Sequence, residues 1–126
     1  NDNNYINVID LNTGNIVYEM NDFWTLEDID INKNEKLLAV IENPFVHIID
    51  LETNNLIKSI LTIDFNTKYI NGLYGGRLSD NGEMIFLHGT EINLVETKTG
   101  RLIKNNNQIR NNECRGCGWI GITWIN

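Results

Sequence analysis

The sequence predicts an all-β protein made of antiparallel four-stranded sheets, and three observations lead to this prediction. A pattern of apolar run, acidic residue, turn rich in Thr, Asn and Gly, and second apolar run occurs three times. The acidic residues of the three copies are Asp10, Asp50 and Glu96, so successive copies are 40 and 46 residues apart. Such an interval is typical of a repeated unit of four strands. No segment shows the apolar spacing of three to four residues that indicates an amphipathic helix.

Length and composition fit one domain, residues 1–126, because 41% of the residues are hydrophobic and a chain of this length can bury a core. The net charge of −7 argues against a nucleic-acid partner, which requires a positive surface. It suits a basic protein partner, and equally a surface that is acidic only for solubility. No apolar run approaches the roughly 20 residues of a membrane span. With only two cysteines, Cys114 and Cys117, a disulfide framework is not expected, which favours a reducing, cytoplasmic location.

The first predicted element is a hairpin, residues 5–20, in which strands at Tyr5–Asp10 and Asn15–Glu19 flank Asn12-Thr13-Gly14. Glycine suits a turn that needs a positive φ. Asn21–Thr25 follows as a loop, and a four-stranded unit then spans residues 22–62. Its expected strands alternate in polarity or are rich in β-branched residues. They are Leu26–Asn32, Lys36–Glu42, Phe45–Leu51 and Asn55–Leu61.

A second four-stranded unit is predicted for residues 66–104, after a loop at Thr62–Asn71. Gly75-Gly76 indicates a bulge or a close backbone approach. Asn105–Glu113 is polar and is expected to be a loop, whereas residues 114–126 end in an alternating pattern that predicts one last strand. The four expected strands of the unit are Gly72–Ser79, Glu83–His88, Glu91–Thr97 and Arg101–Lys104.

These patterns resemble the blades of β-propellers of the WD-repeat type. Ile48-Ile49-Asp50-Leu51-Glu52-Thr53-Asn54-Asn55-Leu56 is similar to the third strand, turn and fourth strand of such a blade. Leu78-Ser79-Asp80-Asn81-Gly82-Glu83-Met84-Ile85, and more weakly the segment Ile31–Leu38, is similar to the first two strands. Aliphatic residues replace the tryptophan of the family's Trp-Asp dipeptide, and the acid remains. The three aliphatic residues are Ile9, Ile49 and Val95.

The resemblance implies a partial, open β-propeller with a half blade at 5–20, blades at 22–62 and 66–104, and a last strand at 114–126. A closed propeller typically has at least four blades. Three arrangements are therefore open: a small protein with an open stack of sheets, a piece of a longer propeller, and self-association. In the last, the N-terminal hairpin of one copy would complete the last blade of another, giving a homodimer.

Alternating strand directions sort the connections to two ends of the sheets, and one end is expected to bind a protein partner. Plain turns such as Asn12-Thr13-Gly14 and Asp80-Asn81-Gly82 lie at one end. Acidic and aromatic residues gather on the connections at the other, where aromatics dominate binding energy and acids select a basic partner. The alternative is that the aromatic residues are blade-core residues. The candidate binding residues are Asp22, Phe23, Trp24, Glu42, Phe45, Asp64, Phe65, Tyr69 and Glu91.

Catalytic and metal chemistry is poorly supported by the sequence. Cys114-Arg115-Gly116-Cys117 has the spacing of a redox pair or half a zinc site, but it lacks the other ligands and the βαβ context. His47 lies in an apolar strand and is expected to be a satisfied, half-buried residue, while His88 precedes a loop. No nucleophile accompanies either histidine in a recognisable setting. No catalytic residue, metal or cofactor is therefore expected.

The function expected from these features is non-catalytic protein binding. A small acidic inhibitor of the immunity or antitoxin type, which neutralises a basic partner such as a nuclease toxin, fits the charge and the acidic aromatic loops. The alternative is a segment of a larger WD-repeat-like propeller that acts as a scaffold for protein assembly. An enzyme is the least favoured class.

Overall fold

The structure, a computed structural model, describes residues 4–23, 25–62, 73–89 and 92–106. These residues form ten strands in three antiparallel sheets, and no α-helix occurs among them. The all-β prediction and its open, four-stranded, blade-like sheets are therefore confirmed. Within the same residues, no helix is long and apolar enough to cross a membrane.

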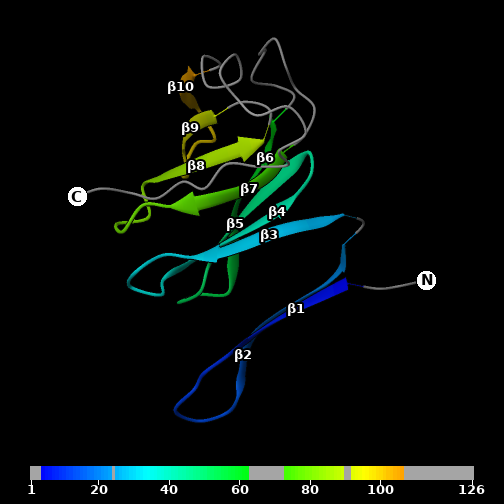
Figure 1. The fold of residues 1–126 in the computed structure, drawn as a ribbon. Helices are drawn as coiled ribbons and strands as arrows, with labels where there is room; N and C mark the ends of the chain where they lie inside the picture. Colours follow the sequence, from blue (N-terminus) through cyan, green and yellow to red (C-terminus); the bar gives the residue numbers. More distant parts are fainter. Residues whose placement is uncertain (1–3, 24, 63–72, 90–91, 107–126) are drawn as a thin grey trace.

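Each sheet is a meander in which every strand pairs with its neighbour along the chain. Figure 1 shows the three sheets stacked, with the two-stranded sheet outermost and β3 running beside β7. The two-stranded sheet contains β1 (Asn4–Ile9) and β2 (Ile16–Phe23). The middle sheet contains β3 (Leu26–Ile31), β4 (Leu37–Glu42), β5 (Phe45–Asp50) and β6 (Asn55–Leu61). The last contains β7 (Leu73–Leu78), β8 (Met84–Gly89), β9 (Ile92–Glu96) and β10 (Leu102–Asn106).

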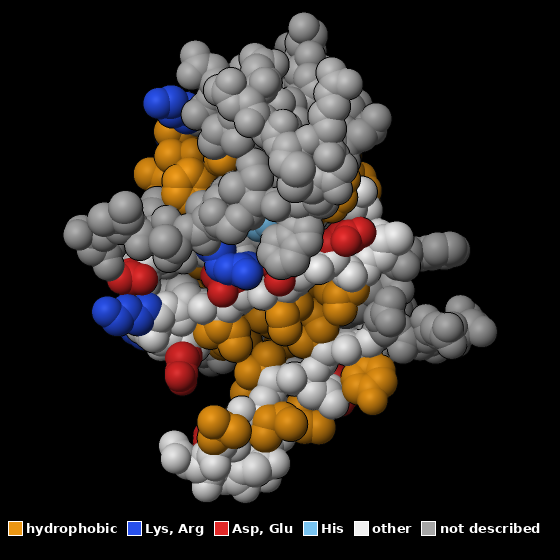
Figure 2. Space-filling view, viewed as in Figure 1, with side chains coloured by type: hydrophobic (Ala, Val, Ile, Leu, Met, Phe, Trp, Pro, Cys, Tyr) orange, Lys and Arg blue, Asp and Glu red, His pale blue; other side chains and the backbone are white. Residues whose placement is uncertain are grey.

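Two apolar layers hold the stack together, and the middle sheet contributes to both. Because β4 lies between them, four consecutive residues of this strand, 38–41, are fully buried. Even-numbered ones face the hairpin and odd-numbered ones face the last sheet, as strand alternation requires. Figure 2 shows the first layer as apolar side chains between the hairpin and β3. The first layer contains Ile6, Leu38, Val40 and Ile49, and the second includes Ala39, Ile41, Ile48, Ile85, Leu87 and Val95.

The acid of each repeat has a structural role, because it organises the turn that follows. Asp10 Oδ1 accepts the backbone N–H of Asn12 at 2.8 Å, and Asp50 Oδ1 accepts that of Glu52 at the same distance. Both are Asx turns, in which the side chain imitates a backbone carbonyl. The longer Glu96 side chain instead accepts the Thr99 hydroxyl. The repeating acid therefore stabilises the turns of the three hairpins.

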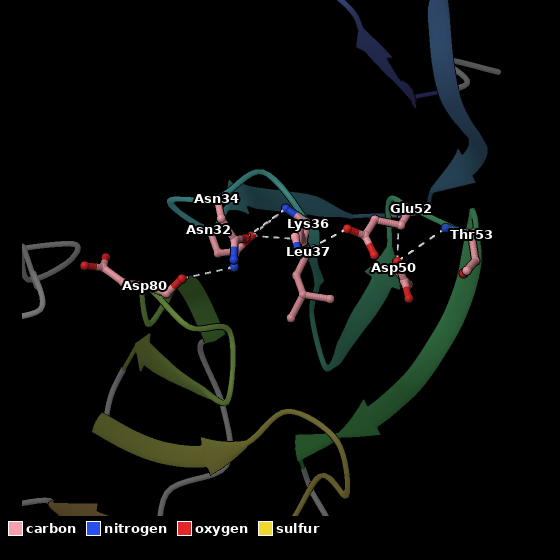
Figure 3. A network of polar contacts seen from close by, with 8 residues as sticks. All are labelled: Asn32, Asn34, Lys36, Leu37, Asp50, Glu52, Thr53 and Asp80. Carbon is pink, nitrogen blue, oxygen red and sulfur yellow. Dashed lines mark hydrogen bonds and ion pairs between the residues drawn. The ribbon is translucent and has the colours of Figure 1, made fainter.

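A second repeated turn, between β3 and β4, also joins the middle sheet to the last one. Buried Asn32 accepts the backbone N–H groups of Lys36 (3.0 Å) and Leu37 (2.8 Å) through Oδ1. Its Nδ2 donates to the carbonyl oxygen of Asp80 at 3.2 Å, in the β7–β8 turn. Figure 3 shows this amide between the two turns, with the Asx turn of Asp50 close by.

The structure differs from the sequence prediction at two strand ends. Strand β2 continues through Phe23, which pairs with Asn4, so Asp22 and Phe23 are on a strand and the predicted loop at 21–25 is wrong at these positions. Strand β10 likewise includes Asn105, which was expected in a loop. Pairing with the preceding strand extends both elements beyond their apolar residues. The predicted bulge at Gly75 is confirmed by a register shift between β7 and β8. The predicted strand at 114–126 lies outside the described residues.

Candidate functional site

The strands' connections define two ends of the stack. The turn end carries the turns β1–β2, β3–β4, β5–β6, β7–β8 and β9–β10, and the loop end carries the connections β2–β3, β4–β5 and β8–β9. A pocket of about 310 Å³ lies at the loop end, between the middle and last sheets. It forms where β3 and β7 begin and β8 ends. Its lining residues are Glu27, Asp28, Tyr74, Arg77 and His88.

Asp28 connects the two sheets inside this pocket. Its Oδ2 accepts the backbone N–H of Gly76 at 3.2 Å and Arg77 Nη1 at 2.6 Å. Arg77 Nη1 also lies 2.6 Å from the carbonyl oxygen of Gly76, which fixes the guanidinium against β7. Figure 2 shows acidic and basic side chains together in a band between the two sheets. Among the described residues no hydrogen bond to Asp28 Oδ1 occurs.

Gly75 makes the close approach of Asp28 and His88 possible. A Cβ at this position would lie 2.7 Å from His88 Nε2 and 2.8 Å from Asp28 Oδ2. Contacts this short are not found for real Cβ atoms, so any other residue would push the imidazole and the carboxylate apart. The absence of a side chain at Gly75 therefore shapes the floor of the pocket.

His88 is buried, with 5% of its surface exposed, and its Nδ1 has no hydrogen-bond partner among the described residues. Burial lowers the pKa of this imidazole, and the positive charge of Arg77 lowers it further, while Asp28 opposes both effects. The ring is therefore neutral at physiological pH. Because a buried N–H without an acceptor is costly, we assign the proton of the neutral ring to Nε2 and leave the buried Nδ1 unprotonated.

Asp30 lies two residues after Asp28 on β3 and binds the outer edge of β7, which is the last strand of its sheet. Its Oδ2 accepts the backbone N–H of Leu78 at 2.8 Å, two residues beyond the N–H that Asp28 accepts. Alternate residues of β3 thus cover alternate N–H groups of β7, which protects the edge from pairing with another strand. Burial raises the pKa of Asp30, although the Leu78 N–H and Arg77 act in the opposite direction.

A second polar cluster lies beside the β4–β5 turn, at the same end. His47 Nε2 is 3.0 Å from Glu42 Oε1, and His47 Nδ1 is 2.8 Å from Ser59 Oγ. The ring of Phe45, which is 39% exposed, stacks on His47 with 5.9 Å between ring centroids. His47 is thus half-buried with both nitrogens partnered, as the sequence indicated. Two predicted binding residues, Glu42 and Phe45, are brought together through it.

The remaining predicted binding residues are only partly placed. Asp22 and Phe23 are on β2, and only their backbone is described. The other five lie outside the described residues, as do Cys114 and Cys117. These five are Trp24, Asp64, Phe65, Tyr69 and Glu91. Whether the nine residues form one surface therefore remains a prediction.

Sequence reasoning missed most of the pocket. It singled out His88, but not Glu27, Asp28, Tyr74 or Arg77. One signal was present: Asp28, Asp30 and Asn32 alternate with apolar residues, which places three polar side chains on one face of a strand. Their partners are 48 residues further along the chain, close to the repeat interval. Comparison of equivalent positions in the two four-stranded units is therefore a way to predict such contacts between sheets from the sequence.

The described lining of the pocket brings charged, aromatic and imidazole groups together. It contains no serine, threonine or cysteine beside His88. No group of three or more potential metal ligands occurs in the described part of the chain. Charged, aromatic and neutral imidazole groups around a cavity are suited to holding a polar ligand.

Comparison with known proteins supports the fold and goes no further. No protein-family model and no curated protein sequence matches the chain. Among solved structures, 156 chains are similar. One is a chain of hydrazine synthase from Kuenenia stuttgartiensis, with a TM-score of 0.58 and 17% sequence identity. The similarity covers 77% of this chain but only 28% of that one, so the chain spans little more than a quarter of the solved structure that it resembles.

Proposed function

We propose that this chain is a non-catalytic protein-binding protein whose loop end binds a basic partner. The observation that supports this is an acid beside the pocket that has no basic neighbour. Some acids of the turn end are paired, since Lys36 Nζ is 3.3 Å from Glu52 Oε1 and Arg101 Nη2 is 3.6 Å from Glu96 Oε2, whereas exposed Glu35 and Glu83 form no ion pair among the described residues. At the loop end, exposed Glu27 has no such neighbour among the described residues.

The loop end also carries negative charge in addition to the Asp28–Arg77 ion pair. Arg77 neutralises Asp28, but it is the only lysine or arginine among the described lining residues, and Glu27 adds a further negative charge. Glu42 contributes another at the β4–β5 turn, where its Oε1 lies 3.0 Å from His47 Nε2. Complementary charge accelerates encounter with a basic protein and sets its orientation. The exposed ring of Phe45 offers an apolar contact beside these charges.

The most specific form of this proposal is an inhibitor of the immunity or antitoxin type. A nuclease toxin carries a basic surface because it must bind phosphates. An acidic protein that covers this surface blocks substrate binding without any chemistry of its own. The net charge of −7 and the acids of the loop end supply the complementary surface.

Charge reversal at each end tests the proposal. The double variant Glu27→Lys/Glu42→Lys changes the loop end, and Glu83→Lys, an exposed acid at the turn end, is the matched control. Proteins cross-linked to each purified variant in a lysate of the source cells are identified by mass spectrometry. We expect the wild type and Glu83→Lys to capture the same basic protein and the double variant to lose it. The captured protein's nuclease activity is then assayed with and without the chain.

Two results contradict the proposal. Equal capture by the double variant would show that the loop end does not contribute to binding. Capture of an acidic protein would show that charge complementarity does not operate. A circular-dichroism melting curve for each variant excludes unfolding as the cause of lost capture.

A propeller scaffold of the WD-repeat-like type is the second candidate, because one exposed face favours it. Ile9 and Ile49 are equivalent in the repeat, but Ile9 is 51% exposed and Ile49 is fully buried. Leu11 is 95% exposed, whereas its equivalent, Leu51, packs against the apolar layer. The outer face of the β1–β2 hairpin thus has the apolar residues that cover another sheet, from a longer propeller or from a second copy.

The solution mass of the isolated chain, measured by light scattering, separates these arrangements. A stable monomer favours the self-contained inhibitor. A discrete dimer that Ile9→Asn/Leu11→Asn dissociates indicates completion of a blade by a second copy. Aggregation that the same double variant relieves favours the scaffold, in which further blades cover this face.

A further inference from the structure

The pocket at the loop end has a composition that suits a cation better than an anion. Its charged groups among the described residues are Glu27, Asp28 and Arg77, and these carry a negative formal charge together while His88 is neutral. Arg77 is already engaged with Asp28 Oδ2 and with the Gly76 carbonyl oxygen, both at 2.6 Å. An anionic ligand would therefore compete with a formed ion pair and would meet the uncompensated carboxylate of Glu27.

The groups that remain are acceptors and an aromatic face. Asp28 Oδ1 accepts no hydrogen bond from a described residue, and exposed Glu27 offers both of its oxygens. Tyr74, which is 42% exposed, lines the same cavity. A cation above an aromatic ring gains electrostatic attraction, and carboxylates beside it supply charge-assisted hydrogen bonds.

From these contacts we infer that the pocket is a subsite for one cationic side chain, a lysine ammonium or an arginine guanidinium, presented by the basic partner. The inference rests on the proposed function and adds the group that the chain recognises. Glu27 and Asp28 Oδ1 accept the hydrogen bonds, Tyr74 covers the cation, and Gly75 leaves the space in which Asp28 and His88 lie together. A cavity of about 310 Å³ is large enough for a single side chain and too small for a folded segment.

Neutral His88 is part of this subsite, because a protonated imidazole would repel the ligand. The charged groups that face it are Arg77 on β7 and Asp28 on β3. Asp28 is held by two donors already, so it cannot fully offset a new positive charge on the ring. Binding of the cation should therefore weaken when acid protonates His88.

The test is an NMR titration of the isotope-labelled full chain with three probes: Nα-acetyl-arginine amide, Nα-acetyl-lysine amide and the neutral Nα-acetyl-citrulline amide. The signals followed are the Gly75 amide and the His88 imidazole. We expect saturable shifts with one or both cationic probes and none with the citrulline amide. Glu27→Gln should weaken binding about threefold, the effect of losing one exposed ionic contact. Glu83→Gln, at the turn end, should change nothing.

Equal shifts with the citrulline amide, or equal affinity in Glu27→Gln and wild type, would overturn the subsite. A second variant, Gly75→Ala, should abolish the shifts by filling the floor, with Gly14→Ala as control because nothing lies within 4 Å of a Cβ there. The outcomes also separate this inference from the proposed function. If the capture experiment yields a basic partner and the amides do not bind, the partner uses another part of the loop end. If capture fails as well, the proposed function is wrong.

Discussion

Asn32 shows how one side chain can stabilise both a turn and the joint between two sheets. Its carbonyl oxygen accepts two N–H groups at the start of β4, and its amide nitrogen donates to Asp80 O in the next sheet. All three groups lie where water is scarce, because Asn32 is only 3% exposed. Its removal takes away the acceptor of the Leu37 N–H, one of the two acceptors of the Lys36 N–H and the donor to Asp80 O, which costs more than a hydrogen bond at the surface.

We predict that Asn32→Ala lowers the free energy of unfolding by about 1–3 kcal/mol. Asn34→Ala is the control, since exposed Asn34 accepts one N–H of the same turn, that of Lys36 at 3.2 Å, and its loss should cost less than about 0.5 kcal/mol. Urea denaturation followed by tryptophan fluorescence measures both. Equal losses in the two variants would show that the joint to Asp80 contributes nothing.

His88 and Asp30 affect stability in opposite directions as the pH changes. The folded pKa of His88 is below its ordinary value of 6.5, so its contribution is complete above pH 6.5 and is lost as the pH falls through the folded pKa. The folded pKa of Asp30 is above its ordinary value of 3.8. Its contribution is complete below pH 3.8 and is lost as the pH rises through the folded pKa.

We predict that His88→Gln flattens the loss of stability that the wild type shows when the pH falls below 6.5. Glutamine has no titratable group, so the variant avoids charging a buried ring. The measurement is the free energy of unfolding at a series of pH values between neutral and mildly acidic. Parallel curves for the variant and the wild type would mean that His88 is protonated equally easily in the folded and unfolded chains.

At the scale of elements, each turn has one position with a left-handed backbone, and its neighbours decide how strictly glycine is required. Gly14 in the β1–β2 turn has φ = +75°, and Gly82 in the β7–β8 turn has φ = +76°. A Cβ on Gly14 would meet nothing within 4 Å, whereas one on Gly82 would lie 2.6 Å from Leu37 Cδ1. Backbone strain is thus the same at the two positions, and only Gly82 adds a packing conflict.

We predict that Gly14→Ala costs about 1–2 kcal/mol, the penalty of a left-handed alanine. Gly82→Ala should cost more, because Leu37 must also move away from the second apolar layer, against which it packs. Thermal and urea unfolding of the two variants measures the difference. A smaller loss of stability for Gly82→Ala than for Gly14→Ala would contradict this, because it would show that Leu37 moves away from the new Cβ without a measurable cost.

The sequence predicted the strands well because their signals are local. Apolar alternation and turn residues such as Asp80-Asn81-Gly82 depend on near neighbours, and all ten described strands lie at or within two residues of predicted ones, apart from the longer ends of β2 and β10. The pocket was not predicted because its contacts cross sheets. In the sequence alone nothing distinguishes Asp28 from an ordinary exposed acid, because its contact with β7 joins residues that are 48 positions apart. The requirement for glycine at position 75 likewise depends on the nearby side chain of His88.

For the whole molecule, stacking of the sheets makes the two ends different. The turn end is held by side chains that bind their own turns or the neighbouring sheet, as Asn32 and Asp50 do. The loop end instead gathers the pocket, the exposed ring of Phe45 and the carboxylates of Glu27 and Glu42. The same strand meander therefore gives one end whose side chains stabilise the stack and another end that carries the pocket.

The most direct test of this account is hydrogen exchange of the chain alone and in complex with the basic protein that it captures, read out by mass spectrometry. We predict that exchange slows at the loop end, in the segments that contain Glu42 to Phe45, Tyr74 to Gly76 and His88. Exchange at the turns around Asn12 to Gly14 and Lys33 to Glu35 should not change. Slower exchange confined to those turns would contradict the account, because the partner would then bind the end that we assign to stability.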